Sequence, residues 1–188
     1  MPYEFLTKAR LTAALRRLSD LATAEGIELD VAIYGGAVFT LVYGSREATK
    51  DVDAIIKPAD VGARLVATVA AEQGLPEDWL NGEVRQFLSP FDQRRPFPTK
   101  EFEPGLRITI PTAKYLLALK LKAARPRVLG YAGDEPDIKF LLGKVRPENL
   151  EAVDEVFEGF FPGEIPHEFA RAMVERLLSE LKERPLEE

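Results

Sequence analysis

The sequence predicts a mixed α/β fold, in which a small mixed β-sheet is flanked by helices and followed by a helical C-terminal part. Two observations support this fold class. Short apolar runs, partly β-branched, have strand character, and amphipathic segments that end at glycines stand between them. The strands are expected at residues 31–34, 51–56 and 106–110. One helix is expected before the first strand, at residues 6–25, and another between the second and third strands, at residues 61–73. Because strands and helices alternate, they should pack as layers.

The two helices show amphipathic spacing and glycine stops. Leu11, Leu15 and Leu18 recur on one face of the first helix, with charged residues between them. Gly26 ends this helix and Gly74 ends the second, because glycine readily adopts the backbone conformation that closes a helix. Such helices are expected to cover the sheet.

The strand at residues 106–110 alternates in character. Its apolar face carries Leu106, Ile108 and Ile110, and its polar face carries Arg107 and Thr109. Residues 76–99, which precede this strand, are rich in turn formers and are expected to be irregular. Pro111 is expected to start a helix that runs to about Ala124.

The domain organisation expected from these elements is an α/β core of residues 1–110 and a helical part of residues 111–188 packed on it. The C-terminal part is acidic, and amphipathic helices are predicted at residues 147–157 and 164–183. The only histidine, His167, has no second histidine or cysteine to share a metal, so we expect a structural role for it.

Composition excludes several classes of protein. The 188 residues are 46% hydrophobic, which is enough to build one substantial domain or a compact pair. The absence of cysteine excludes disulfides and thiolate metal sites. A formal net charge of −6 argues against broad nucleic-acid binding. No apolar run is long enough to cross a membrane and no signal-peptide core is present, so we expect a cytoplasmic protein without a membrane partner.

Gly35 and Gly36 stand between the first strand and a short apolar segment, residues 37–43, that is expected to be helical. A strand, a glycine turn and a helix start together present free N–H groups and a partial positive charge, which suits a phosphate group. The alternative is that the two glycines serve only close packing.

Asp51 and Asp53 flank Val52 at the start of the second strand. Side chains alternate along a strand, so the two carboxylates should share one face. Like charges in this arrangement repel each other unless a cation or a proton lies between them, and Mg²⁺, which prefers oxygen ligands, is the natural candidate. The alternative is an exposed strand start with two solvated aspartates.

Two other features allow both a functional and a structural interpretation. Trp79 and Asn81 could stack on a base and hydrogen-bond to it, although a tryptophan beside a leucine is more often a core anchor. Residues 105–133 contain no acidic side chain, and Lys120 and Lys122 lie within them. These lysines form either a solvated face or a positive field for a polyanion. The loop cations Arg85, Arg94, Arg95 and Lys100 present the same choice between solvation and a phosphate contact.

The run Gly35-Gly36, Arg46, Thr49 and Asp51-Val52-Asp53 resembles the signature of the DNA polymerase β-like nucleotidyltransferase superfamily. In that superfamily a glycine turn precedes a helix, and a later strand carries two metal-binding acids separated by one apolar residue. A third acid usually comes from a strand at about residues 106–110, and this chain has none there. Either another carboxylate completes the site, or the metal chemistry is weakened or lost.

Residues 115–125, followed by residues 134–138, are similar to the bacterial branch that contains abortive-infection and type IV toxin–antitoxin nucleotidyltransferases. By this resemblance Lys120 would contact phosphate, and Asp134 or Asp137 would be the later acid of the site. The alternative is that both aspartates cap a helix.

The resemblance implies a nucleotidyltransferase that moves a nucleoside monophosphate from a nucleoside triphosphate to an acceptor hydroxyl. Asp51 and Asp53 would hold Mg²⁺, Gly35 and Gly36 would admit the phosphates, and the cations Lys120 and Arg46 would neutralise developing charge. Asp137 would serve as a base.

The acceptor remains open among transfer RNA, a protein and a small molecule. Two alternatives to an active enzyme also remain open. One is a catalytically degenerate nucleotide-binding or regulatory protein, and the other is an interaction protein that pairs with an antitoxin or forms a homo-oligomer.

Overall fold

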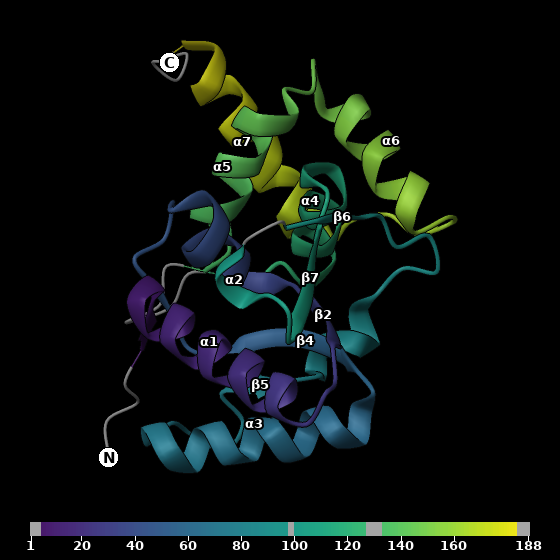
Figure 1. Ribbon diagram of the computed structural model, residues 1–188. Coiled ribbons are helices and arrows are strands. Elements are labelled where there is room, and N and C mark those ends of the chain that lie inside the picture. Colours follow the sequence, from purple (N-terminus) through teal and green to yellow (C-terminus); the bar gives the residue numbers. More distant parts are fainter. Residues whose placement is uncertain (1–4, 98–99, 127–132, 184–188) are drawn as a thin grey trace. The chain divides into compact units, whose positions relative to one another are not determined.

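The computed structural model describes residues 5–97, 100–126 and 133–183 (Figure 1). Its architecture is mixed α/β, which confirms the predicted fold class. The chain divides into two compact units. The sheet unit comprises Met1–Gln86 and Arg94–Ile110, and the helical unit comprises Phe87–Gln93 and Pro111–Glu188.

The main sheet of the sheet unit has five strands among the described residues, in the order β5-β4-β2-β7-β6. The strands are β2 (Leu29–Ile33), β4 (Val52–Lys57), β5 (Leu80–Asn81), β6 (Arg94–Pro96) and β7 (Leu106–Pro111). The central strand β2 pairs antiparallel with β4 and parallel with β7, and β4 pairs parallel with β5. A separate two-stranded sheet joins β1 (Leu6–Thr7) to β3 (Ala48–Thr49).

The sheet unit also contains several helical segments among its described residues. They are α1 (Lys8–Ala24), α2 (Gly35–Val38) with a following π-helix (Phe39–Tyr43), α3 (Ala59–Gln73) and two 3₁₀ turns (Glu83–Phe87 and Lys100–Phe102). Helix α3 packs on α1 and on β4 (Figure 1). A Cβ atom at Gly62 of α3 would collide with the Ile56 side chain. Alternation along β4 therefore turns Val52, Ala54 and Ile56 toward α3, and Asp53 and Ile55 away from it.

The predicted strands at residues 31–34, 51–56 and 106–110 correspond to β2, β4 and β7, and the predicted helices at residues 6–25 and 61–73 correspond to α1 and α3. The expectation that residues 76–99 are irregular was wrong in part, because β5 and β6 form the two edges of the sheet. Strands of two and three residues are too short to show a periodic pattern.

Pro111 does not start a helix. It is the last residue of β7, and Thr112 caps the next helix by accepting a hydrogen bond from the Tyr115 backbone N–H at 3.3 Å. Proline has no N–H to donate, so it fits the end of a strand as readily as the start of a helix.

The helical unit contains four helices among the described residues. They are α4 (Ala113–Ala123), α5 (Glu135–Val145), α6 (Leu150–Phe160) and α7 (Glu168–Glu183). Helix α4 packs against α5 and α6, and α7 packs against the same two helices. Fully buried core side chains include Leu117, Leu121, Ile138, Leu141, Phe157, Val174 and Leu177. Helix α5 is an addition to the sequence prediction, and Pro136 in its first turn is the local signal for its start.

Residues 87–93, which precede the predicted boundary at residue 110, belong to the helical unit. The Ser89 backbone N–H donates to the Tyr115 hydroxyl at 2.9 Å, and the Ser89 hydroxyl donates to the Phe160 carbonyl at 2.5 Å. These bonds tie the segment to α4 and α6. In the same unit His167 Nδ1 accepts from the Phe169 backbone N–H at 3.2 Å, which is a contact at the start of α7.

Among the helices in the described part of the chain, none combines the length and the apolar composition needed to cross a bilayer.

Candidate functional site

Asp53 lies against Gly35, where β2 passes into α2. The antiparallel register places Ile33 opposite Ala54, and the Tyr34 backbone N–H then donates to the Asp53 carbonyl at 2.8 Å. A Cβ atom at Gly35 would collide with Asp53 Oδ2 and would lie 3.2 Å from its Cγ. The backbone φ of Gly35 is +60°, a region that favours glycine. Only glycine therefore fits both the backbone and the space that the Asp53 carboxylate occupies.

Gly36 allows a second close approach at the same helix start. A Cβ atom there would collide with Thr49 Oγ1 and would lie 2.7 Å from Arg46 Nη1. Thr49 is buried and Arg46 is half-buried. The close-packing role that the sequence left open for the glycine pair is thus present, and the side chains it accommodates are Asp53, Thr49 and Arg46. The start of α2 carries a partial positive charge, which favours a carboxylate beside it.

Asp51 precedes β4 and lies beside Asn81 of the neighbouring strand. Asn81 Nδ2 is 3.4 Å from Asp51 Oδ2, and Asn81 stands opposite Asp53 in the parallel register of β4 and β5. Burial raises the pKa of Asp51, and the nearby Asp78 and Glu83 carboxylates raise it further, although Lys50 and the Asn81 hydrogen bond act in the opposite direction. The Asp51 carboxylate is therefore a place where a cation would stabilise the charged form.

Burial alternates along this part of β4, and this alternation locates the acids. Val52 and Ala54 are buried, whereas Asp51 and Asp53 are half-buried. The acids are thus neither fully solvated nor enclosed. Asp53 lies on the sheet face opposite to the one that α3 covers, and Asp51 immediately precedes β4.

Trp79 is a core anchor and does not present a stacking surface. Its side chain is fully buried and Nε1 donates to the Val66 carbonyl at 3.2 Å. The Val52 backbone N–H donates to the Trp79 carbonyl at 2.7 Å, which aligns β5 with β4. Asn81, two residues later, is consequently held beside the acids. The sequence showed this asparagine only as a possible base contact, since no local pattern links it to Asp51.

Strand β7 carries no acid, and its polar face is occupied by other contacts. Arg107 pairs with Asp30 at 2.5 Å and with Glu28 at 3.3 Å, and Thr109 Oγ1 accepts from Arg94 Nη1 at 3.3 Å. The Arg107 guanidinium holds the pKa of Asp30 below its usual range. The other loop cations Arg85, Arg95 and Lys100 have exposed side chains.

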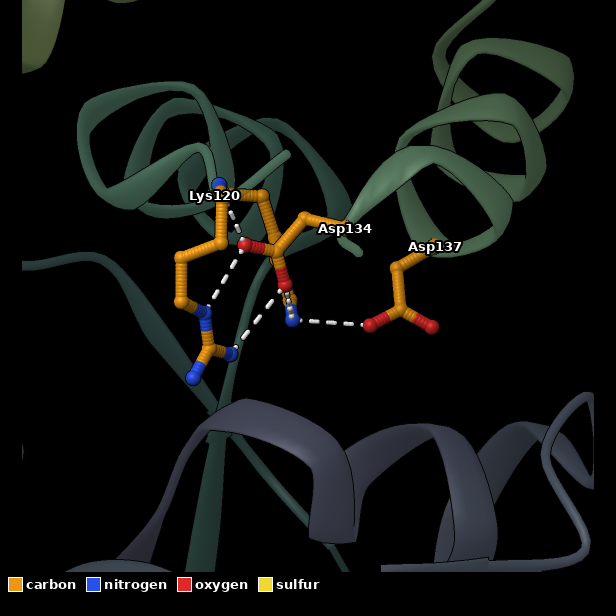
Figure 2. Close-up of polar contacts among 4 residues, drawn as sticks. Lys120, Asp134 and Asp137 are labelled. Carbon is orange, nitrogen blue, oxygen red and sulfur yellow. Dashed lines mark hydrogen bonds and ion pairs between the residues drawn. The ribbon is translucent and has the colours of Figure 1, made fainter. Parts of the chain in front are cut away.

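The helical unit holds a second group of charged side chains, which we call the Lys120 cluster: Lys120, Arg125, Asp134 and Asp137. Lys120 Nζ lies 2.8 Å from Asp134 Oδ1 and 2.7 Å from Asp137 Oδ2 (Figure 2). Asp134 also accepts from the Arg125 backbone N–H at 2.9 Å and from its guanidinium at 3.1 Å and 3.2 Å. The Asp134 side chain is 0% exposed and the Lys120 side chain 7% exposed.

Asp134 is charged despite its burial. Burial alone would raise its pKa, but the hydrogen bonds and positive charge of Arg125 and Lys120 outweigh this and lower the pKa to about 2. The cluster contains two cations and two carboxylates, so its formal charges balance.

These contacts bear on two sequence interpretations. Lys120 does not lie on a solvated face, because its ammonium is buried between two aspartates. Lys122, by contrast, is half-buried and pairs with Glu164 at 2.9 Å. Asp134 occupies the position before α5, yet its side chain makes no capping hydrogen bond. It turns instead toward Lys120 and Arg125, so the cluster links the end of α4 to the start of α5.

The predicted site residues are thus distributed between the two units. Gly35, Gly36, Arg46, Asp51 and Asp53 belong to the sheet unit, whereas Lys120 and Asp137 belong to the helical unit. The structure brings Gly35 together with Asp53 and Gly36 together with Arg46, whereas Asp51 lies beside Asn81. Lys120 contacts both of the aspartates that the sequence offered as the later acid, Asp134 and Asp137. Contact with this lysine therefore does not distinguish between them.

Within the described residues, no group of three or more His, Cys, Asp or Glu side chains is arranged to hold a metal ion. The candidate donors are the carboxylates of Asp51 and Asp53. Their chemistry fits Mg²⁺, which is bound in many phosphoryl-transfer sites by one or two carboxylates, with water and substrate phosphates as the other ligands. The raised pKa of Asp51 agrees with a site that needs a cation.

Comparison of the chain with protein-family models, with curated proteins and with solved structures gave no match.

Proposed function

We propose that this chain is a Mg²⁺-dependent nucleotidyltransferase, which moves a nucleoside monophosphate from a nucleoside triphosphate to an acceptor hydroxyl. The observation that carries the proposal is the contact of Asp53 with Gly35 at the start of α2. The antiparallel pairing of β2 and β4 joins a half-buried acid to a helix start, with Arg46 beside it. A carboxylate and a guanidinium at one helix start are suited to a metal-bound triphosphate.

The residues have distinct roles in the proposed reaction. Asp51 and Asp53 would hold the ion, which when bound supplies positive charge that offsets the charge of the triphosphate. Gly35 keeps the Asp53 carboxylate close to the helix start. Arg46 provides a planar guanidinium beside Gly36 that suits phosphate oxygens. The acceptor hydroxyl attacks the α-phosphorus, the new P–O bond forms, the bond to pyrophosphate breaks, and the hydroxyl proton passes to solvent.

In this proposal the Lys120 cluster stabilises the fold and is given no part in the reaction. Asp137, which the sequence suggested as a base, is 4% exposed and paired with Lys120. A buried carboxylate in an ion pair is poorly suited to accept a proton from an acceptor. We therefore assign no general base, and the phosphate contact of Lys120 stays a prediction.

A catalytically degenerate nucleotide-binding protein is the second candidate. The observation that favours it is the lack of an acid on β7, where Leu106, Ile108 and Ile110 are buried and Arg107 and Thr109 have other contacts. Such a protein would bind nucleotide without depending on the ion for chemistry.

Label transfer distinguishes these functions. The full chain is incubated with each nucleoside triphosphate labelled at the α-phosphate, with Mg²⁺ and with separate pools of RNA, including transfer RNA, protein and small hydroxylated molecules. Transfer to one pool by the wild type, with loss in Asp53→Asn, is the expected result. Asp20→Asn, which changes an exposed aspartate of α1, is the matched control and should retain transfer.

Two other outcomes argue against the enzyme. Transfer at the wild-type rate by a folded Asp53→Asn variant would remove the assignment of this acid. Nucleotide binding that is equal with and without Mg²⁺, together with no transfer to any pool, would favour the degenerate protein.

A further inference from the structure

The orientation of the Asn81 amide is determined by three neighbours. The Glu83 backbone N–H donates to Asn81 Oδ1 at 3.0 Å, so this atom must be the carbonyl oxygen. The nitrogen then faces two acceptors, the Asp78 carbonyl at 3.3 Å and Asp51 Oδ2 at 3.4 Å. Asn81 therefore presents a donor, and no free oxygen, to the Asp51 carboxylate.

Three features hold the position of Asn81 as well. The indole of Trp79 is buried in the core, and its Nε1 is bonded to the Val66 carbonyl. Leu80 pairs with Val52, and Asn81 pairs with Asp53 in the parallel ladder. The amide is thus attached to a rigid strand on one side and to the turn at Glu83 on the other. Because the Asn81 side chain is already held in place, it loses little further conformational entropy when it orients a neighbouring side chain.

Asp51 needs such a partner because it precedes the first residue of β4. The ladder that fixes Asp53 does not include it, and the nearby Asp78 and Glu83 carboxylates repel its negative charge. An N–H donor on the adjacent strand restricts the direction of the carboxylate without adding charge.

We propose that Asn81 is a positioning residue that holds the Asp51 carboxylate in the orientation needed to bind a divalent cation together with Asp53. This inference rests on the proposed function, and it names a residue that acts through Asp51 without itself contacting the ion. Partners of this kind, which orient a metal ligand, commonly change metal affinity by about 10- to 100-fold when they are removed.

The test is a titration of the full chain with Mn²⁺ alone. The electron paramagnetic resonance signal of the free ion measures how much Mn²⁺ is bound. Mn²⁺ stands in for Mg²⁺ because it accepts the same oxygen ligands. Asn81→Leu keeps the approximate shape of the side chain and removes the donor, and it is expected to weaken Mn²⁺ binding by about 10-fold or more.

Asn149→Leu is the matched control. Asn149 caps α6 by accepting from the Ala152 backbone N–H at 2.9 Å, so the substitution also removes a structural hydrogen bond of an asparagine. It should lower the stability of the fold slightly and leave Mn²⁺ affinity unchanged. Circular dichroism verifies that each variant is folded.

The outcomes separate the inference from the function on which it rests. Wild-type Mn²⁺ affinity in a folded Asn81→Leu variant would overturn the positioning role. If the wild-type chain binds no Mn²⁺, alone or with a non-hydrolysable nucleoside triphosphate, the proposed function itself is overturned.

Discussion

Replacement of Lys120 by methionine tests the stabilising role of the Lys120 cluster. Methionine keeps most of the side-chain volume, so the main change is the loss of the ammonium between Asp134 and Asp137. Both carboxylates are nearly inaccessible to water, at 0% and 4% exposure. Removal of one partner from a buried ion pair costs about 3–5 kcal/mol, because a buried carboxylate then loses its countercharge without gaining hydration. Arg125 still contacts Asp134, so the loss falls mainly on Asp137. We expect the free energy of unfolding to fall by about this amount.

The measurement is urea-induced unfolding followed by far-UV circular dichroism, with Lys139→Met as the matched control. Lys139 pairs with Glu180 at 2.7 Å, the same separation as Lys120 and Asp137, but these two side chains are 43% and 39% exposed. Exposed pairs contribute about 0–1 kcal/mol, so the control should change little. Equal losses in the two variants would refute the reasoning, since burial would then not determine the strength of the pair.

Three further predictions follow from the same contacts. The pKa of Asp134, lowered from 3.8 to about 2, contributes on the order of 2 kcal/mol to stability. Because the pKa of Asp134 is lower in the folded state than in the unfolded state, this contribution is fully present above pH 3.8 and is lost as the pH falls through about 2. Asp134→Asn should flatten this part of the curve of unfolding free energy against pH. Gly35→Ala should displace Asp53 and abolish Mn²⁺ binding, whereas Gly26→Ala, with a similar φ of +69° but no atom within 4 Å, should cost only about 1–2 kcal/mol of backbone strain. If both glycine variants bind Mn²⁺ equally, the contact with Asp53 has no role in ion binding. Trp79→Ala should lower the free energy of unfolding by about 3–5 kcal/mol, measured by urea titration with circular dichroism, and a loss below about 1 kcal/mol would contradict its role as the core anchor of β5.

The sequence by itself determined the elements that are long enough to show a period. Apolar spacing located α1 and α3, and alternation located β4 and β7, because these patterns depend on residues only a few positions apart. The placement of Asp51 and Asp53 on either side of Val52 was also readable locally. The contact of Gly35 with Asp53 was not, although both residues lie in or beside the first two predicted strands.

Only the tertiary structure decided which distant side chains became neighbours. Asn81 meets Asp51 across 30 residues because β5 pairs with β4, and a two-residue strand carries no periodic signal of its own. Lys120 became a buried partner of Asp134 and Asp137 because α4 packs on α5, although a lysine in a basic run more often remains in water. Local conformational preference acts over a few residues, whereas burial and ion pairing depend on which surfaces the folded chain brings together.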